Sequence, residues 1–122
     1  MMKKILLADD KEDVRLLVKT TLEGLDYEFH YAANGKEAYD RACQVRPDVI
    51  VLDVMMPVMD GFEACQKIKK DDSIKHIPVV ILSAKGQDSD RQKGERLKAD
   101  AYIVKPFSPL SLLETIESLV SQ

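Results

Sequence analysis

The sequence has 122 residues, which is enough for one hydrophobic core with flanking helices and too short for two domains. Hydrophobic residues make up 45% of the chain and charged residues 32%, a balance that argues against disorder and against a disulfide scaffold. The formal net charge is −3 and the lysines and arginines are scattered, so the sequence lacks the basic stripe of a nucleic-acid-binding domain. We therefore expect one domain, residues 1–122, that binds no nucleic acid.

No segment of the sequence has the features of a membrane span or an export signal. The apolar runs fall short of the roughly 20 residues that a span needs, and the run after MMKK is too short for a signal peptide. Cys43 and Cys65 have no CxxC spacing and no neighbouring histidine, so both are expected to be reduced structural thiols. These features predict a cytoplasmic protein without membrane contact.

The first half of the chain predicts strands and helices in alternation. Residues 5–8 form a short apolar run that predicts a strand, and residues 28–32 predict a second one. Between them a spacing of three and four residues predicts a helix, with Gly24 near the end of the pattern as a stop signal; the pattern consists of Val14, Leu17, Val18, Thr21, Leu22 and Leu25. A turn at Asn34-Gly35 then precedes a second helical pattern, formed by Ala38, Ala42 and Val45.

Three further strands are predicted at residues 49–52, 79–82 and 102–104. Most of the five runs are apolar throughout, which is typical of a parallel sheet that is covered on both faces. After residues 49–52, Asp60 can cap a third helix whose apolar face consists of Phe62, Cys65 and Ile68.

The last two helices differ in the strength of their patterns. Residues 89–98 predict a helix that contains Gly94 and offers only Leu97 to the core. The final helix has Ser108 as its N-cap, Pro109 in its first position and an apolar face of Leu112, Leu113, Ile116, Leu119 and Val120. Five strands alternating with helices through short connections predict one doubly wound α/β fold.

Four of the five apolar runs end in a polar residue. The first run closes on Asp9 and Asp10, the third on Asp53, the fourth on Ser83 and the fifth on Lys105. In an open parallel sheet the carboxyl ends of the strands lie at one edge, and ligands bind there where the winding reverses direction. Each residue alone has a simpler explanation as a helix cap, a turn residue or a solvated charge. Their coincidence at four strand ends favours a shared site.

The residue types at these strand ends indicate phosphoryl chemistry. Three carboxylates in one crevice repel one another unless a cation neutralises them, and magnesium suits such a site because it takes oxygen ligands and keeps several waters. Lys105 adds a positive charge and Ser83 a hydroxyl donor. A carboxylate in these surroundings is equipped to attack phosphorus, because phosphoryl transfer depends mainly on positioning and on charge neutralisation.

Four motifs in fixed order, LLADD, VIVLDVMMPVMDG, VVILSA and AYIVKPF, resemble those of response-regulator receiver domains, a family typified by the single-domain chemotaxis regulator. The resemblance covers the whole chain. It implies a five-stranded flavodoxin-like sheet of order 2-1-3-4-5 with five flanking helices. It also implies a switch of a two-component phosphorelay, with a sensor histidine kinase or a histidine phosphotransfer protein upstream. Downstream it implies a protein target or an output domain in a longer regulator.

The resemblance assigns the acidic residues to a magnesium-dependent phosphorylation site. Asp53 is similar to the phosphoacceptor of the family, which promotes its own phosphorylation and dephosphorylation without being an enzyme in the usual sense. Asp10 and Asp53 resemble direct Mg²⁺ ligands, Asp9 a ligand through water, and Met55 the donor of a main-chain carbonyl.

The resemblance also assigns the residues that sense the phosphoryl group. Lys105 is similar to the phosphate-binding lysine, and its bond to Pro106 resembles the cis proline of the family. Ser83 matches the hydroxyl residue that moves to the phosphoryl group, and Ala84 matches the small residue that leaves room for it. Tyr102 resembles the aromatic residue that swings inward.

The chain departs from the family at Lys98, where a glycine commonly ends the fourth helix. A residue with a Cβ must then adopt the backbone that the turn demands, so we expect a strained or altered turn before Tyr102.

Three alternatives use a similar fold or chemistry. An aspartyl phosphatase of the haloacid-dehalogenase type needs an acid two residues after its nucleophile, where this chain has Met55. A flavin- or nucleotide-binding module needs a donor-rich phosphate loop after the first strand, where this chain has Asp9 and Asp10. A receiver-like domain that is never phosphorylated remains an alternative that the presence of every acidic and basic position disfavours.

Overall fold

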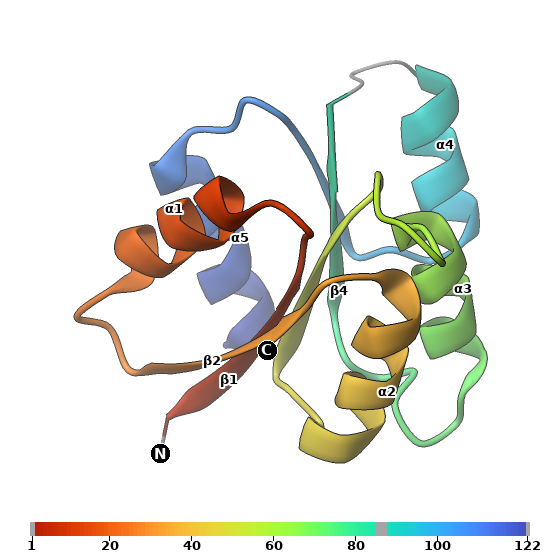
Figure 1. Cartoon of the computed structure of the whole chain (residues 1–122), viewed down its shortest axis with the longest axis horizontal. Coiled ribbons are helices and arrows are strands. Elements are labelled where there is room, and N and C mark those ends of the chain that lie inside the picture. Colours follow the sequence, from red (N-terminus) through yellow and green to blue (C-terminus); the bar gives the residue numbers. More distant parts are fainter. Residues whose placement is uncertain (1, 85–87, 122) are drawn as a thin grey trace.

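The computed structural model describes residues 2–84 and 88–121, and within these ranges strands and helices alternate along the chain (Figure 1). In chain order the elements are β1 (Lys3–Ala8), α1 (Glu12–Leu22), β2 (Tyr27–Ala32), α2 (Gly35–Val45), β3 (Val49–Asp53), α3 (Gly61–Lys70), β4 (Val79–Ser83), α4 (Asp88–Arg96), β5 (Ala101–Val104) and α5 (Pro109–Val120). Each predicted apolar run lies inside a strand, and each strand extends its run by one or two residues. The extension matters at β3 and β4, because Asp53 and Ser83 are the last residues of these strands.

The strands of the described chain form one parallel sheet of order β2-β1-β3-β4-β5, which confirms the flavodoxin-like topology. The chain adds β2 on one side of β1 and β3, β4 and β5 on the other, so the winding reverses between β1 and β3. At this switch point Ala8 pairs with Leu52. The residues that follow this pair, Asp9 and Asp53, therefore leave the sheet side by side.

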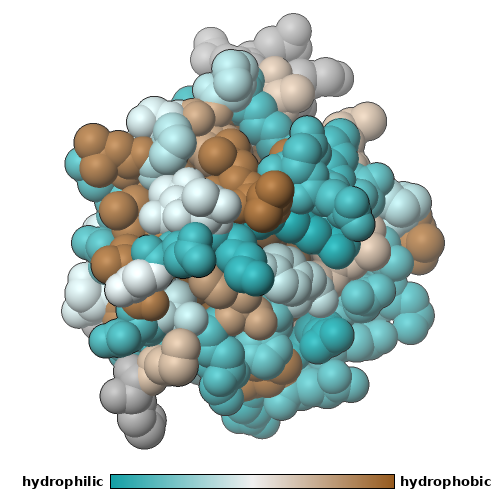
Figure 2. Space-filling view, turned by 60° about the vertical axis from the view of Figure 1, so that its left-hand side comes forward, coloured by the Kyte–Doolittle hydropathy of each residue, from teal (hydrophilic) through white to brown (hydrophobic). Residues whose placement is uncertain are grey.

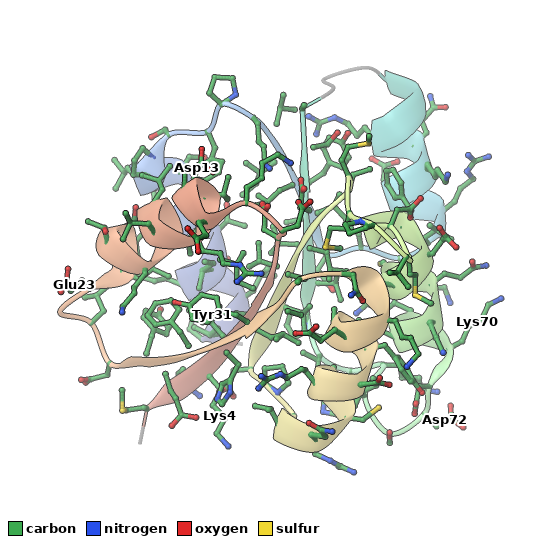
Figure 3. The ribbon with its side chains drawn as sticks, viewed as in Figure 1. Lys4, Asp13, Glu23, Tyr31, Lys70 and Asp72 are labelled. Carbon is green, nitrogen blue, oxygen red and sulfur yellow. The ribbon has the colours of Figure 1, made fainter. Side chains whose placement is uncertain are left out.

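Helices cover both faces of the sheet. Figure 1 shows α1 and α5 on one side and α2, α3 and α4 on the other. Every residue of β3 and β4 is buried, which explains the uniformly apolar runs in the sequence. Side chains alternate between the two cores, so Leu6 and Ile50 face α2 and α3 while Leu7 and Val51 face α1 and α5. Tyr31, labelled in Figure 3, lies on the α1 and α5 side, where the Arg15 guanidinium is 5.8 Å from its ring centroid.

The N-cap residues of α2, α3 and α5 explain where these helices begin. Asp60 and Glu63 form a capping box at the start of α3, and the Ser108 side chain accepts a hydrogen bond at the start of α5, as predicted. The predicted turn at Asn34-Gly35 is wrong. Asn34 is the N-cap of α2, its side chain accepts a hydrogen bond from the Glu37 amide at 2.8 Å, and Gly35 is already helical.

Helix α1 is shorter and less buried than its sequence pattern predicts. It ends at Leu22, so Leu25 lies beyond it, and Leu17 is 42% exposed although its spacing predicts a core position. Val18 and Leu22 form the buried stripe, and Leu17, which directly precedes Val18, is rotated from this stripe by about 100° around the helix axis. Figure 2 shows separate hydrophobic patches on this side of the molecule, and Leu16 of α1 and Leu110 of α5 are among the exposed leucines.

The weakly apolar segment before β5 is a helix, α4, as predicted. It buries Gly94, and Leu97 packs at its end against the core that faces α2 and α3. Lys98, in the turn that follows, has a positive φ of 66°, which confirms the predicted strain. Among the described helices, none is long and apolar enough to cross a membrane.

Candidate functional site

Asp53 lies at the carboxyl end of the central strand β3 and is only 2% exposed. Its Oδ1 accepts a hydrogen bond from Lys105 Nζ at 2.9 Å. Its Oδ2 is buried and has no hydrogen-bond partner among the described residues. Burial raises the pKa of this carboxyl above its ordinary value; the Lys105 hydrogen bond acts against this shift, and the charge of Asp9 adds to it. A buried carboxylate oxygen without a hydrogen-bond partner is a candidate ligand or nucleophile.

Asp9 and Asp10 follow the neighbouring strand β1. Asp9 is completely buried, and both of its carboxylate oxygens are engaged: Oδ1 accepts from the Lys11 amide at 2.9 Å and Oδ2 from Lys105 Nζ at 3.2 Å. Arg15 Nε donates to the Asp9 carbonyl at 2.7 Å and fixes the start of α1 against this loop. Asp10 is exposed at the rim.

One oxygen from each of Asp9, Asp10 and Asp53 lies within 4.8 Å of the others. Among the described residues, the three carboxylates face two ammonium groups, those of Lys105 and Lys11, and these two leave an excess of negative charge. Carboxylate oxygens at this spacing fit a magnesium ion, which prefers oxygen ligands, and Asp53 Oδ2 has no hydrogen-bond partner among the described residues that the ion would have to displace. The sequence predicted this convergence from the strand ends.

Lys105 joins the two buried carboxylates from the far end of the chain. It lies directly after β5, and its amide donates to the Ser83 carbonyl at 2.7 Å. Burial alone would lower the pKa of its ammonium group, but the hydrogen bond to Asp53 and the charge of Asp9 outweigh burial and raise the pKa. The Lys105-Pro106 peptide bond is cis, as the resemblance implied. Lys105 is therefore a fixed positive charge at the base of the site.

Ser83 and Ala84 stand at the end of β4, the strand next to Asp53. Ser83 is buried, and Ala84 lies exposed in the bend that follows it. The Leu82 carbonyl accepts from the Val54 amide at 3.0 Å, which aligns the end of β4 with the residue after Asp53. The predicted small and hydroxyl residues are thus at the edge of the sheet that carries the carboxylates.

Met55 belongs to the loop between β3 and α3. Its side chain is 66% exposed, and the residue lines a hollow at the mouth of the site together with Asp10, Val54, Met56, Pro57 and Asp60. A carbonyl from this loop can therefore face the same hollow as the Asp10 carboxylate.

Gly61 is a residue of the site that sequence reasoning did not single out. A Cβ at this position would lie 2.3 Å from the carbonyl oxygen of Asp53, and the Gly61 amide donates to the Val54 carbonyl at 3.0 Å. Only glycine allows α3 to begin this close to the end of β3. The signal was present in the sequence, because this glycine closes the motif that begins with the third strand.

Tyr102 lies away from the carboxylates, on the side of the sheet that α4 covers. It is half-buried, and the Arg91 guanidinium is 5.1 Å from its ring centroid. A Cβ on Gly94 would be 3.4 Å from the tyrosine ring, so this ring packs directly against the α4 backbone. The structure therefore connects β5 to α4 through Tyr102.

Lys11 is the second residue that sequence reasoning missed. Its Nζ lies 3.6 Å from Asp10 Oδ1 and 3.8 Å from Asp53 Oδ2. The predictions used strand ends as their guide, and Lys11 lies one residue past the acidic pair, at the N-cap of α1.

Residues 5–117 match the sequence family described as the response regulator receiver domain. This chain belongs to that family. A probable transcriptional regulator, ycf27, from Cyanophora paradoxa is 43% identical over 118 residues, which are 97% of this chain and 48% of that protein. The receiver domain thus spans about half the length of the curated relatives it matches.

Solved structures of receiver domains are similar over the whole length of the chain. The chemotaxis response regulator CheY4 of Vibrio cholerae has a TM-score of 0.89 and 37% identity, with 98% of this chain and 99% of that one covered. The receiver domain of the sensor histidine kinase PA1611 from Pseudomonas aeruginosa has a TM-score of 0.90 and 25% identity, with both chains fully covered. That structure has a magnesium ion coordinated in its active-site cleft. Receiver domains of this family are signalling switches.

Proposed function

We propose that this receiver domain is the phosphoacceptor of a two-component phosphorelay, and that Asp53 receives the phosphoryl group. The donor is a phosphohistidine of a sensor histidine kinase or of a histidine phosphotransfer protein. The observation that carries this proposal is the Asp53 carboxylate. It is buried at the sheet edge, and Lys105 donates a hydrogen bond to one of its oxygens, whereas the other oxygen has no hydrogen-bond partner among the described residues.

In the proposed reaction a carboxylate oxygen of Asp53 attacks phosphorus, and the bond from phosphorus to the donor nitrogen breaks. The electron pair of that bond leaves with the imidazole, and an acyl phosphate remains on Asp53. Lys105, which lies 2.9 Å from Oδ1, orients the nucleophile and stabilises the added negative charge.

Asp9, Asp10, Asp53 and the main-chain carbonyl of Met55 would hold a magnesium ion. When bound, this ion neutralises charge on the carboxylates and on the phosphoryl oxygens. The protein positions its ligands in advance, because Asp9 is fixed by the Lys11 amide and by Lys105.

The proposed switch uses the strand ends that flank Asp53. Ser83 would turn toward the phosphoryl group, Ala84 would leave room for this movement, and Tyr102 would move inward from its half-buried position to a more buried one. The contact of Tyr102 with Gly94 and Arg91 supports a transmission from β5 to α4. The domain would promote its own phosphorylation and dephosphorylation without turning over a separate substrate.

An aspartyl phosphatase of the haloacid-dehalogenase type is disfavoured by Met55. Such a phosphatase has an acid two residues after its nucleophile. Met55 occupies this position here, and its thioether cannot act as a general acid. The acyl phosphate should therefore persist long enough to signal.

We further propose that residues 1–122 form one cytoplasmic receiver domain. It would act on a separate protein target or on an output domain of a longer regulator, and it would contact neither nucleic acid nor membrane itself. The relatives named transcriptional regulators, about twice as long as this chain, are consistent with the second arrangement.

The test is labelling of the purified chain by acetyl phosphate with and without magnesium, followed by intact-mass measurement. We expect one phosphoryl group on the wild-type chain when magnesium is present, and none on Asp53→Asn, which keeps the shape of the side chain and loses the nucleophile. Asp72→Asn is a matched control, because Asp72 is exposed and remote from the site. Equal labelling of Asp53→Asn and wild type would reject the proposal.

A further inference from the structure

Lys11 is placed at a position where its positive charge is unfavourable for its own helix. It is the N-cap residue of α1, its side chain makes no capping hydrogen bond, and its charge lies at the positive end of the helix dipole. Serine, threonine, aspartate or asparagine would each stabilise this helix start. Residues that break such a local rule are expected at functional sites, where another interaction favours them.

The compensating interaction is with the carboxylates of the site. Lys11 Nζ is 3.6 Å from Asp10 Oδ1 and 3.8 Å from Asp53 Oδ2. These are the two carboxylates that Lys105 leaves open to a cation, because Lys105 binds Asp53 through Oδ1 and binds Asp9 but not Asp10. The Lys11 ammonium group therefore faces the same oxygens that a divalent ion would use.

We propose that Lys11 is an internal counter-ion that competes with the divalent cation for Asp10 and Asp53. This inference rests on the proposed function, since it concerns the metal site of the same reaction. The Lys11 side chain is 52% exposed, so it can turn into solvent when the ion binds, and the competition is electrostatic and not steric. Lys11 thus raises the magnesium concentration that is needed to occupy half of the sites.

The Lys11 amide and the Lys11 side chain have separate roles. The amide donates to Asp9 Oδ1 at 2.9 Å and holds that carboxylate in place. A side-chain substitution leaves this hydrogen bond intact, so the charge can be removed without removing the support of Asp9.

The experiment compares magnesium affinities of the whole chain, measured from the amide shifts of residues 9–11 and 53 in ¹⁵N NMR titrations. Lys11→Gln should bind magnesium about fivefold more tightly than wild type, the effect expected of one exposed unit charge at this distance. Lys11→Arg keeps the charge and should bind within about twofold of wild type. Lys36→Gln is the matched control, because it removes the same charge from an exposed lysine that pairs with Asp40 on α2.

Equal affinities of Lys11→Gln and Lys36→Gln, with clear binding by wild type, overturn the role of Lys11 and leave the metal site standing. Failure of wild type to bind magnesium at millimolar concentrations rejects the metal site of the proposed function, and the Lys11 inference with it. Tighter binding that is confined to Lys11→Gln supports the competition.

Discussion

At the scale of single residues, the backbone of Lys98 shows how a side chain can oppose the turn it occupies. Lys98 has φ 66°, its amide donates to Glu95, and the next amide, that of Ala99, donates to Gly94. This pair of hydrogen bonds is the Schellman arrangement, in which glycine is the preferred residue at the left-handed position. The left-handed conformation costs a residue with a Cβ about 1–2 kcal/mol.

Lys98→Gly should therefore stabilise the protein by about 1 kcal/mol. The substitution removes the Cβ strain, and glycine's larger unfolded-state entropy reduces the gain. Urea unfolding measures the free energy. Lys70→Gly is the control, since Lys70 lies in the last turn of α3 and should lose stability. A free energy of unfolding lower for Lys98→Gly than for wild type would contradict the backbone strain at Lys98.

The carboxyl of Asp53 predicts a pH dependence of stability. Burial holds its pKa above the ordinary 3.8, so the folded protein favours the protonated acid, and this favourable contribution is lost as pH rises through the folded-state pKa. Without metal, Asp53→Asn should be more stable than wild type at neutral pH, and the difference should shrink as pH falls through that pKa. Urea unfolding in a chelator at several pH values measures this difference. A difference that is constant or grows toward low pH would show that the pKa is not raised.

Sequence reasoning found the residues of the site that end strands and missed those that depend on close approach. Asp9, Asp10 and Asp53 followed from the rule that parallel strands share an edge. Gly61 is required by a distance of 2.3 Å to a carbonyl, which no pattern of residue types contains. Lys11 reaches the carboxylates from a helix cap, where a charged side chain ordinarily points to solvent.

At the scale of elements, α4 is held by few apolar contacts and has a glycine in its interior. Gly94 is buried, and a Cβ there would lie 3.4 Å from the Tyr102 ring, an ordinary contact distance. Gly94→Ala should therefore stabilise the protein by about 0.5–1 kcal/mol through the helix propensity of alanine. Thermal unfolding measures the change. Gly24→Ala should destabilise the protein, because Gly24 has φ 86°, a conformation that alanine adopts at a cost. If the two variants changed the melting temperature in the same direction, the expected gain at Gly94 would be contradicted.

Lys69 ties α3 to the connection before β4 and to the turn before β5. Its Nζ donates to the Ile77 carbonyl at 2.9 Å and to Asp100 Oδ2 at 2.9 Å, and the same carboxylate oxygen accepts from the Val79 amide at 2.8 Å. Lys69→Met should cost about 1–3 kcal/mol, because it removes the charged donor from the Ile77 carbonyl and leaves the Asp100 carboxylate with the Val79 amide and without its cation. Urea unfolding tests this cost. The exposed neighbour Lys70, which points away from α3 in Figure 3, is the control, and an equal cost for Lys70→Met would refute the role of Lys69.

The types of the elements could be predicted more securely than their ends. Asp60 and Ser108 mark their helix starts by capping chemistry alone. Asn34 was misjudged because asparagine followed by glycine is favourable both in a turn and at a helix start, and only the packing of Gly35 against Met59 decides between them.

At the scale of the whole molecule, the fold brings together charges that are far apart in the sequence. Five cations line two adjoining hollows between α3 and α4, namely Lys69, Lys70, Lys93, Arg96 and Lys98. They were scattered in the sequence, and their grouping depends on α4 lying beside α3. Such surface features follow from topology and could not be predicted from composition.

The proposed switch also belongs to this scale. The site lies at the carboxyl ends of β1, β3, β4 and β5, whereas Tyr102 packs against the core on one face of the sheet. Figure 1 shows α4 on that face. A helix with so little buried apolar surface is among the least stable parts of a fold, and elements with two arrangements are drawn from such parts. Phosphorylation of Asp53 would then shift a population instead of creating a new fold.

Hydrogen exchange with and without beryllofluoride, an analogue of the phosphoryl group, tests the central claim most directly. With magnesium present, beryllofluoride should increase the protection of amides in residues 83–107 of the wild-type chain, because Ser83 would move toward the modified Asp53, Tyr102 would become more buried and α4 would become more stable. The same treatment of Asp53→Asn should change nothing. Unchanged exchange across residues 83–107 in a wild-type chain with beryllofluoride bound would contradict the claim that Asp53 controls this face.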